Sequence, residues 1–321
     1  MRAVVTGAAG FIGSHLCARL LADGCEVVGV DVLTDTYDPR LKKRNVAALL
    51  GRRTFTFLRA DLLHTPLAPL LDGADAVYHL AGQPGVRTSW GAEFATYVHR
   101  NVLATHAVLE AARAVRPRKL VYASSSSVYG DAARYPTGEA LRPRPVSPYG
   151  VTKLSGEQLC EVYRTAFGLP TVSLRLFTVY GPRQRPDMAF ARLVDAAVRG
   201  EPFTVYGDGE QSRDFTYVAD VVEALCRVVR SDFTGVANVG GGCRVSLNGA
   251  IAVLRSLTGP FDVVRAERAP GDVRHTAADI SLSRAAFGYR PRVGLREGLA
   301  AMVDQARHGR VPVPLHERSD R

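Results

Sequence analysis

The sequence lacks several features that would assign it to common classes of protein. It has no run of about 18 apolar residues, so we expect no membrane-spanning helix. Its first residues, MRAVVTGAAGFIG, contain no apolar signal core, which favours a cytoplasmic protein. The five cysteines include no C-x-x-C pair and indicate reduced, mostly structural thiols. The eight histidines show no H-E-x-x-H or other ligand spacing, so we predict no metal site.

The charge is strongly basic but is not concentrated in one part of the sequence. A net charge of +10 raises the question of a nucleic-acid partner. The basic residues are, however, interleaved with acidic ones, and there is no zinc-finger spacing, basic zipper or RNP-type aromatic motif. We therefore expect no nucleic-acid partner. Small polyanions such as nucleotides and sugar diphosphates account equally well for clustered arginines.

Short valine-rich runs alternate with helical patterns through the first half of the 321 residues. This alternation predicts an α/β fold with a Rossmann-type, doubly wound parallel sheet. After about residue 180 the pattern breaks into shorter pieces punctuated by Pro and Gly, which indicates a smaller C-terminal region over the carboxyl ends of the strands. The expected strands are Arg2–Thr6, Glu26–Asp31, Thr54–Arg59, Ala76–Leu80, Lys119–Ser124 and Thr171–Phe177, and the expected helices are Ile12–Asp23, Tyr97–Ala114 and Tyr149–Phe167.

The stretch VVTGAAGFIGSHL places three glycines, Gly7, Gly10 and Gly13, between the first strand and the first helix. Glycine permits a tight turn and lets backbone N–H groups approach a pyrophosphate at a helix N-terminus. The second strand ends in Asp31, whose carboxylate would accept hydrogen bonds from ribose hydroxyls and repel a 2′-phosphate. NAD is therefore favoured over NADP, although Lys42, Lys43 and Arg44 keep NADP open. Asp61 in RADL and the stretch HLAGQ follow the next two strands, where they could contact adenine and the nicotinamide ribose.

The stretch SPYGVTKLSGE contains Tyr149 and Lys153, four residues apart on one face of a predicted helix. A phenol has an unperturbed pKa near 10 and is a poor base at neutral pH. A nearby ammonium and a positive nicotinamide ring would both lower that pKa. The pair is common by chance, and its meaning comes from its position after the glycine turn and the serine-rich stretch ASSSSVYG.

Together these residues resemble the extended short-chain dehydrogenase/reductases, and more narrowly the nucleotide-sugar epimerases and dehydratases. The resemblance extends through RLFTVYGPRQRPDMAF and GDGEQSRDFTYVADVVEAL. It implies an NAD-binding Rossmann domain over residues 1–180 and a mainly substrate-binding domain over 181–321, with about 213–240 returning to the Rossmann core. It also implies a homodimer formed through two long helices of each subunit, Tyr97–Ala114 and Tyr149–Phe167. The implied NAD contacts are Gly7, Gly10, Phe11, Ile12, Gly13, Asp31, Lys43, Asp61, Leu62, Leu80, Ala81, Gln83, Asn101, Ser124, Tyr149 and Lys153.

The serine-rich stretch bears on the reaction. Members of this group begin by moving a hydride from sugar C4 to NAD, and the resemblance places the catalytic hydroxyl at Ser125, with Ser127 a second hydroxyl near the sugar. Related 4,6-dehydratases carry an Asp-Glu pair before VYG, and related decarboxylases usually carry a Glu, but this sequence has Ser126 and Ser127. A hydroxyl does not have a pKa suited to general acid–base elimination. The stretch therefore favours an epimerase.

The arginines indicate the class of substrate. A diphosphate needs about two arginines as charge-assisted donors, and the surplus suggests a second anion, for which a C6 carboxylate is the natural candidate. DVLTDTYDPRLKKR, AGQPGVRTSW and RLFTVYGPRQRPDMA are similar to stretches of UDP-glucuronate 4-epimerases. This similarity implies substrate contacts from Ser127 and Tyr149, a carboxylate site at Thr178 and Arg185 with Arg87 nearby, and UDP contacts from Arg192, Arg213 and Arg274. A neutral UDP-hexose 4-epimerase, a UDP-glucuronate decarboxylase and a non-enzymatic NAD-binding scaffold stay open as alternatives.

Overall fold

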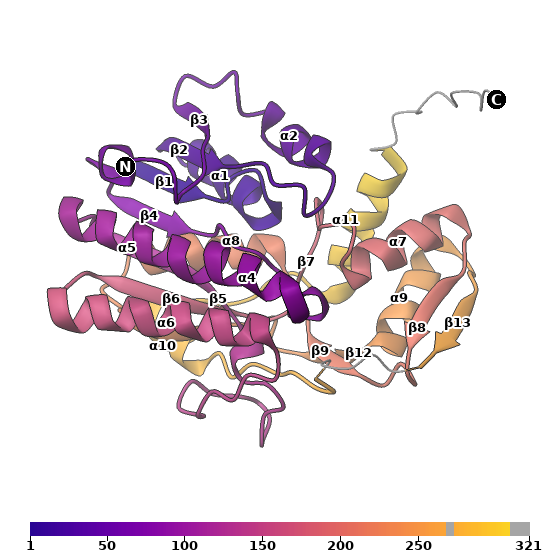
Figure 1. Ribbon diagram of the computed structural model, residues 1–321. Coiled ribbons are helices and arrows are strands. Elements are labelled where there is room, and N and C mark those ends of the chain that lie inside the picture. The colour runs from indigo at the N-terminus through magenta and orange to yellow at the C-terminus, as the bar shows by residue number, and fades with distance from the viewer. Residues whose placement is uncertain (268–272, 309–321) are drawn as a thin grey trace.

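The computed structural model describes residues 1–267 and 273–308, and its centre is a seven-stranded sheet (Figure 1). The strand order is β11-β6-β5-β4-β1-β2-β3, and every neighbouring pair is parallel. This confirms the predicted Rossmann-type doubly wound sheet. The strands are β1 (Arg2–Thr6), β2 (Glu26–Asp31), β3 (Phe55–Arg59), β4 (Ala76–His79), β5 (Lys119–Ser125), β6 (Thr171–Leu176) and β11 (Gly235–Val239).

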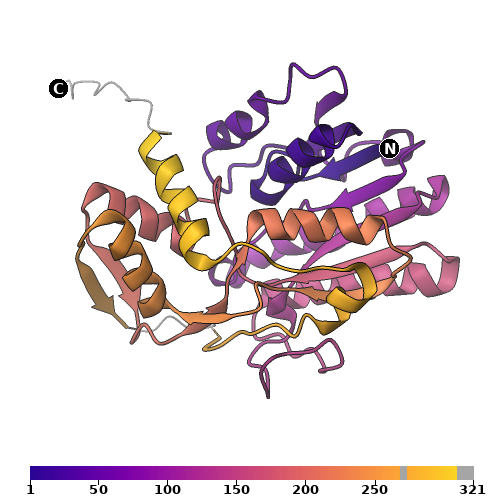
Figure 2. The same ribbon diagram turned by 180° about the vertical axis from the view of Figure 1, so that it is seen from behind.

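Helices cover both faces of this sheet (Figures 1 and 2). On one face, Leu71, Leu109 and Cys160 belong to a hydrophobic cluster shared by α3, α5 and α6. On the other, Leu16 of α1 and Val221 of α8 belong to a second cluster, which also includes α10. Burial on both faces explains why β1, β2 and β4 contain apolar runs instead of alternating apolar and polar residues. The helices are α1 (Phe11–Ala22), α3 (Leu67–Leu71), α5 (Ala104–Val115), α6 (Pro148–Phe167), α8 (Val218–Val229) and α10 (Ser281–Phe287).

A smaller region with its own core stands beside the sheet, at the right of Figure 1. Phe190 of α7, Leu254 of α9 and Leu299 of α11 are buried together there. Strands β8 and β13 pair in parallel, and β9 and β12 pair antiparallel. Its elements are β7 (Val179–Tyr180), α7 (Ala189–Arg199), β8 (Phe203–Tyr206), β9 (Ser212–Asp214), β10 (Thr216–Tyr217), β12 (Arg244–Ser246), α9 (Leu247–Thr258), β13 (Val263–Ala266) and α11 (Leu295–His308).

The chain crosses between the two regions more than once. After β10 it returns to the sheet, where α8 packs against α1 and β11 pairs with β6. It then forms β12, α9 and β13, and α10 lies again beside β11. Residues that are far apart in sequence are therefore brought to the edge where the two regions meet.

The six expected strands and three expected helices are present, with small shifts at their ends. Strand β3 begins at Phe55, one residue later than expected, and β5 continues to Ser125. The helix expected from Tyr97 begins earlier, as α4 (Phe94–Tyr97), passes through a π-helical turn η3 (Val98–Leu103) and continues as α5. Helix α2 (Pro39–Ala47) and the short 3-10 turns η1 (Arg87–Ser89), η2 (Gly91–Glu93) and η4 (Ser126–Val128) complete the described elements. Within the described residues, no helix combines the length and the apolar content needed to cross a bilayer.

Candidate active site

The glycine-rich turn joins β1 to the N-terminus of α1. Gly7 has a φ of +72°, in the left-handed region that favours glycine. A Cβ on Gly13 would lie 2.1 Å from the Gly7 carbonyl oxygen, and this backbone atom cannot move aside easily. Gly10 caps α1, and no side chain caps this helix end. The N-terminus of α1 thus offers backbone N–H groups and a positive dipole end to an anion, as the sequence predicts.

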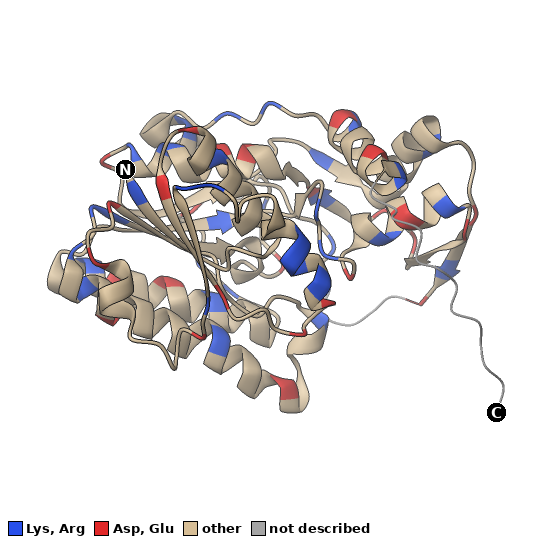
Figure 3. Cartoon of the chain, turned by 90° about the horizontal axis from the view of Figure 1, so that it is seen from above, with Lys and Arg blue, Asp and Glu red and all other residues tan. Residues whose placement is uncertain are grey.

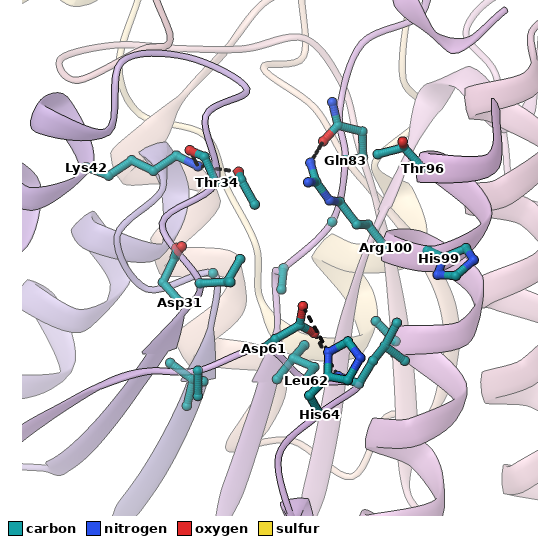
Figure 4. Close-up of a pocket in the computed structure, with 18 of the residues that line it drawn as sticks. Asp31, Thr34, Lys42, Asp61, Leu62, His64, Gln83, Thr96, His99 and Arg100 are labelled. Carbon is teal, nitrogen blue, oxygen red and sulfur yellow. Dashed lines mark hydrogen bonds and ion pairs between the residues drawn. The ribbon is translucent and has the colours of Figure 1, made fainter. Parts of the chain in front are cut away.

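Asp31 lies at the carboxyl end of β2 and lines a cavity of about 490 Å³ (Figure 4). One carboxylate oxygen accepts a hydrogen bond from the Ala9 N–H at 3.1 Å and the other from the Leu33 N–H at 2.8 Å. These bonds fix the carboxylate between the glycine turn and the next loop. The cavity is also lined by five of the other residues predicted to contact NAD: Gly7, Asp61, Leu62, Ala81 and Gln83.

Lys42 lines this cavity, and the NAD contact expected of Lys43 stays a prediction. Lys42 Nζ donates to the Thr34 carbonyl at 2.9 Å and to the Thr34 hydroxyl at 2.7 Å, whereas Lys43 is exposed and lines none of the described cavities. Arg100 was not predicted as a site residue. It lies on the wall opposite Lys42, and its Nη1 donates to the Gln83 side-chain oxygen at 2.7 Å (Figure 4). Helix α2 determines which of the two adjacent lysines faces inward, and this short helix has no periodic apolar pattern from which that direction could be predicted.

Asn101 sits in the π-helical turn η3, and such turns are frequent at functional sites. Its side-chain oxygen accepts from the Gln83 N–H at 2.6 Å, and its amide donates to the Gln83 carbonyl and to Thr152 at 3.0 Å each. A Cβ on Gly82 would lie 2.8 Å from the Asn101 oxygen and 3.5 Å from Lys153 Nζ. Asn101 therefore ties the strand end that lines the cavity to α6.

Tyr149 and Lys153 lie in the first turns of α6. The Ser147 hydroxyl accepts from the Gly150 N–H at 3.1 Å, and Pro148 occupies the first turn, so the helix start is fixed by a side-chain cap. Both side chains line a second cavity of about 370 Å³. A third cavity, of about 170 Å³ at the glycine turn, shares lining residues with the first and with the second. Lys153 Nζ donates to the Ala123 carbonyl at 2.8 Å and lies 4.9 Å from the centre of the Tyr122 ring.

The environment changes the acidity of both groups. Burial raises the pKa of the Tyr149 phenol, while hydrogen bonding with Ser125 and the charge of Arg185 lower it. Burial lowers the pKa of the Lys153 ammonium to about 8, against the charge of Glu157, which raises it. An additional positive charge in the cavity, such as an oxidised nicotinamide ring, would favour the phenolate. The site is therefore suited to a base that forms only when the cofactor is in place.

The four serines at the end of β5 have different surroundings. The Ser124 hydroxyl donates to Glu157, in the interior. The Ser125 hydroxyl donates to the Ser127 hydroxyl at 3.1 Å and accepts from the Ser127 N–H at 3.1 Å. All four residues from Ser124 to Ser127 line the second cavity together with Tyr149. Within this cavity no Asp or Glu is found among the described lining residues, in agreement with the serine pattern of the sequence.

Besides Ser127 and Tyr149, three of the expected substrate residues line the second cavity: Thr178, Arg185 and Arg213. Arg185 forms a two-point ion pair with Asp187, with distances of 3.0 and 2.8 Å. It also lines the cavity of about 170 Å³ at the glycine turn, together with Gly7, Gly10 and Gly13. The guanidinium of Arg87 lies 5.0 Å from the centre of the ring of Tyr206, the last residue of β8. Tyr206 was not predicted as a site residue, because it is far from Arg87 in the sequence and meets it only in the folded chain.

Arg192 and Arg274 are not brought to the described cavities. Arg192 is exposed on α7, and Arg274 pairs with Asp208 at 2.9 Å with both side chains about half exposed. Basic and acidic residues are interspersed over both regions of the chain (Figure 3), so many of the arginines have local partners. The UDP contacts expected of Arg192 and Arg274 stay predictions.

His79 is buried at the end of β4 and has a structural environment. Its ring nitrogens lie 2.8 Å from the Thr6 hydroxyl and 3.0 Å from the Thr105 hydroxyl. Burial and the charge of Lys153 lower its pKa to about 3, so the ring stays neutral. No group of three His, Cys, Asp or Glu side chains in residues 1–267 and 273–308 is arranged to hold a metal ion.

Comparisons with known proteins show the family of the chain. The sequence model of the NAD dependent epimerase/dehydratase family matches residues 3–240. The chain is 44% identical over 303 residues to an uncharacterised UDP-glucose epimerase of Bacillus subtilis (93% of this chain, 96% of the relative). It is 38% identical to a probable UDP-glucuronate 4-epimerase of Rhizobium meliloti (95% of this chain, 96% of the relative).

Among solved structures, the chain resembles the UDP-glucuronic acid 4-epimerase of Bacillus cereus in complex with UDP-glucuronic acid and NAD. The TM-score is 0.92 and the identity is 44%, with 96% of this chain and 99% of the other covered. The glycine turn, Asp31 and the Tyr149/Lys153 pair lie within the matched residues 3–240. The chain belongs to the NAD dependent epimerase/dehydratase family.

Proposed function

We propose that the protein is an NAD-dependent 4-epimerase that interconverts UDP-glucuronate and UDP-galacturonate. One observation carries the proposal: a single cavity contains the Tyr149/Lys153 pair, a serine-lined strand end and the Arg185 guanidinium. The pair supports oxidation at a sugar hydroxyl, the serines do not support elimination, and the guanidinium supports binding of a second anion. The similarity to UDP-glucuronate 4-epimerases supports the same choice.

The residues fit NAD, because the glycine turn is a cradle that a Cβ would fill and Asp31 faces the same cavity. When bound, NAD accepts a hydride from sugar C4 and later returns it. Tyr149 removes the proton from the C4 hydroxyl, with Ser125 orienting that hydroxyl. Lys153 holds the nicotinamide ribose and stabilises the phenolate electrostatically. After the 4-keto sugar turns over, Tyr149 returns the proton to the C4 oxygen, and the hydride is returned to the opposite face of C4.

A 4-keto uronic acid is a β-keto acid and can lose carbon dioxide, so the site must restrain its carboxylate. We assign this restraint to Arg185 and Thr178, both in the second cavity. Arg185 already has a fixed orientation through Asp187. A held carboxylate keeps the breaking C–C bond out of line with the carbonyl π system.

Incubating the protein and NAD with UDP-glucuronate, UDP-glucose and UDP-GlcNAc, followed by NMR, tests the proposal. We expect UDP-galacturonate from the first and little conversion of the other two. Conversion of the neutral sugars alone would favour a UDP-hexose 4-epimerase, to which the similarity with a UDP-glucose epimerase points. Release of carbon dioxide as the main reaction would indicate a decarboxylase, and no turnover of any sugar would indicate a scaffold.

Replacing Arg185 with Ala should lower kcat/KM for UDP-glucuronate by about 10- to 100-fold, because hydrogen bonds to a charged group contribute about 1.5–3 kcal/mol. A pentose or 4-keto pentose product should appear in the NMR spectrum. Arg199→Ala is the matched control, since Arg199 pairs with Asp195 on the exposed face of α7. Unchanged epimerisation with no decarboxylated product would contradict the assignment of Arg185.

We further propose that residues 1–180 and the returning segment form the NAD-binding domain, while most of 181–321 binds the UDP-sugar. The protein would act as a homodimer in the cytoplasm. Exposed apolar side chains on α6, at Val151, Val162 and Phe167, support a helix-to-helix contact between subunits. Sedimentation analysis tests the dimer, and a monomer at micromolar concentration would contradict it. Cell fractionation tests the cytoplasmic location.

A further inference from the structure

Glu157 lies one helical turn beyond Lys153 on the same face of α6, but it is not in the cavity. Its side chain is 1% exposed. The Glu157 carboxylate accepts a hydrogen bond from the Ser124 hydroxyl of β5. It also accepts hydrogen bonds from Arg175 of β6, from Nε at 2.9 Å and from Nη2 at 2.7 Å. A carboxylate is therefore fixed in the interior, directly behind the lysine that the reaction requires.

Arg175 also contacts the ring of Tyr129. Its guanidinium lies 4.6 Å from the centre of the Tyr129 ring, and the Tyr129 hydroxyl donates to Asn238 of β11 at 2.8 Å. Among the described residues, Arg175 Nη1 is buried with no hydrogen-bond partner. The network thus joins three neighbouring strands, β5, β6 and β11, to α6.

Such a pair is poorly explained by stability alone. Removing two charges from water carries a desolvation penalty that can exceed their attraction, and a hydrophobic pair of similar volume is often as stable or more stable. The unpartnered nitrogen of Arg175 adds to this penalty. A buried charge at this position is better explained by an effect on the neighbouring ammonium of Lys153.

The titratable and charged groups around Lys153 come from several elements. Tyr149, Glu157 and Cys160 lie on α6, Tyr122 lies beneath the ammonium on β5, and His79 faces it from β4. His79 stays neutral because burial lowers its pKa. Burial raises the pKa values of Tyr149, Cys160 and Tyr122, so before the cofactor binds these four groups carry no charge near neutral pH. Glu157 is the remaining negative charge in this set.

We propose that Glu157, anchored by Arg175 and Ser124, is a positioning residue that keeps the Lys153 ammonium charged and aligned behind the cofactor. Burial lowers the pKa of Lys153 to about 8, and the charge of Glu157 opposes this decrease. Without Glu157, a larger share of Lys153 would be neutral near pH 7. A neutral amine would stabilise neither the Tyr149 phenolate nor the ribose contact.

The sequence makes a direct measurement practical, because it contains only four lysines, Lys42, Lys43, Lys119 and Lys153. In protein labelled with ¹³C at lysine Cε, NMR titration reports the pKa of each, and the spectrum of Lys153→Met assigns the relevant signal. We expect Glu157→Gln to lower the pKa of Lys153 by about one unit, the effect of losing one nearby opposite charge. The alkaline limb of the kcat–pH profile should move to lower pH by the same amount.

Glu157→Asp keeps the negative charge, so the pKa of Lys153 in this variant should stay close to the wild-type value. Glu161→Gln is the matched control on the next turn of α6, since Glu161 pairs with Arg164 at the surface, and it should leave the Lys153 titration unchanged. If Glu157→Gln does not fold, the double variant Glu157→Gln/Arg175→Gln leaves neither charge buried and should show a smaller downward shift, because a positive charge is removed with the negative one. An unchanged Lys153 pKa in the folded variant would overturn the proposal.

The role of Glu157 rests on the proposed function only in the kcat–pH profile, which uses UDP-glucuronate as the substrate. The NMR titration needs no substrate, so the two can fail separately. Absence of UDP-glucuronate turnover with a shifted Lys153 pKa would contradict the proposed function alone. Turnover with an unshifted pKa would contradict the role of Glu157 alone.

Discussion

Replacing Tyr149 with Phe should lower kcat for epimerisation by about 10²- to 10⁴-fold, the contribution typical of a positioned proton-transfer group. The ring fills the same space, so its edge contact with Tyr97, at 6.2 Å between ring centres, should persist. Only the proton acceptor is removed. NAD binding, measured by calorimetry, should therefore weaken by no more than the loss of one hydrogen bond, about 0.5–1.5 kcal/mol.

Tyr163→Phe is the matched control for this prediction. Tyr163 lies on the same helix, and its hydroxyl bonds to Glu110, away from the described cavities. Its replacement should leave kcat close to the wild-type value. Equal activity of wild type and Tyr149→Phe would show that another group removes the proton.

Replacing Gly13 with Ala should impair both folding stability and NAD binding. The added Cβ would lie 2.1 Å from the Gly7 carbonyl oxygen and 3.0 Å from Ala8 Cα, so the turn and α1 must separate. Overpacking of this kind costs about 1–3 kcal/mol, and displaced N–H groups would no longer meet a pyrophosphate. We expect a melting temperature lower by several degrees and at least about a 100-fold weaker NAD affinity, with 1.4 kcal/mol for each tenfold change.

Gly51→Ala provides the comparison, because no atom lies within 4 Å of an added Cβ there. Its melting temperature and NAD affinity should match those of the wild type. Tight NAD binding by Gly13→Ala, measured by calorimetry, would show that the glycine turn does not hold the cofactor.

The sequence predicted those parts of the site that depend on local spacing. Gly7 and Gly13 follow a strand and begin a helix, and Tyr149 and Lys153 are separated by one helical turn, so each set can be placed without knowledge of distant contacts. Asp31 follows from the end of the second strand. The π-helical turn that holds Asn101 could not be predicted, because a π-helical turn has no distinct hydrophobic period.

Long-range pairing was less predictable. Glu157 and Arg175 are 18 residues apart and meet only because α6 packs on β6. The inward direction of Lys42 rather than Lys43 depends on how α2 docks. Arg192 and Arg274 were assigned from resemblance, and their UDP contacts stay predictions. In the structure both lie at the surface, where Arg274 pairs with Asp208. Charged side chains are long and their partners are chosen by the tertiary fold, so spacing alone does not place them.

The central claim is that a hydride leaves sugar C4 and returns to the same carbon on the opposite face. Incubating the protein and NAD with UDP-glucuronate carrying deuterium at C4, followed by NMR and mass spectrometry, tests this claim most directly. The proposed function predicts UDP-galacturonate that retains deuterium at C4, with no loss of mass. Failure to form UDP-galacturonate, or its formation with hydrogen at C4, would contradict the claim.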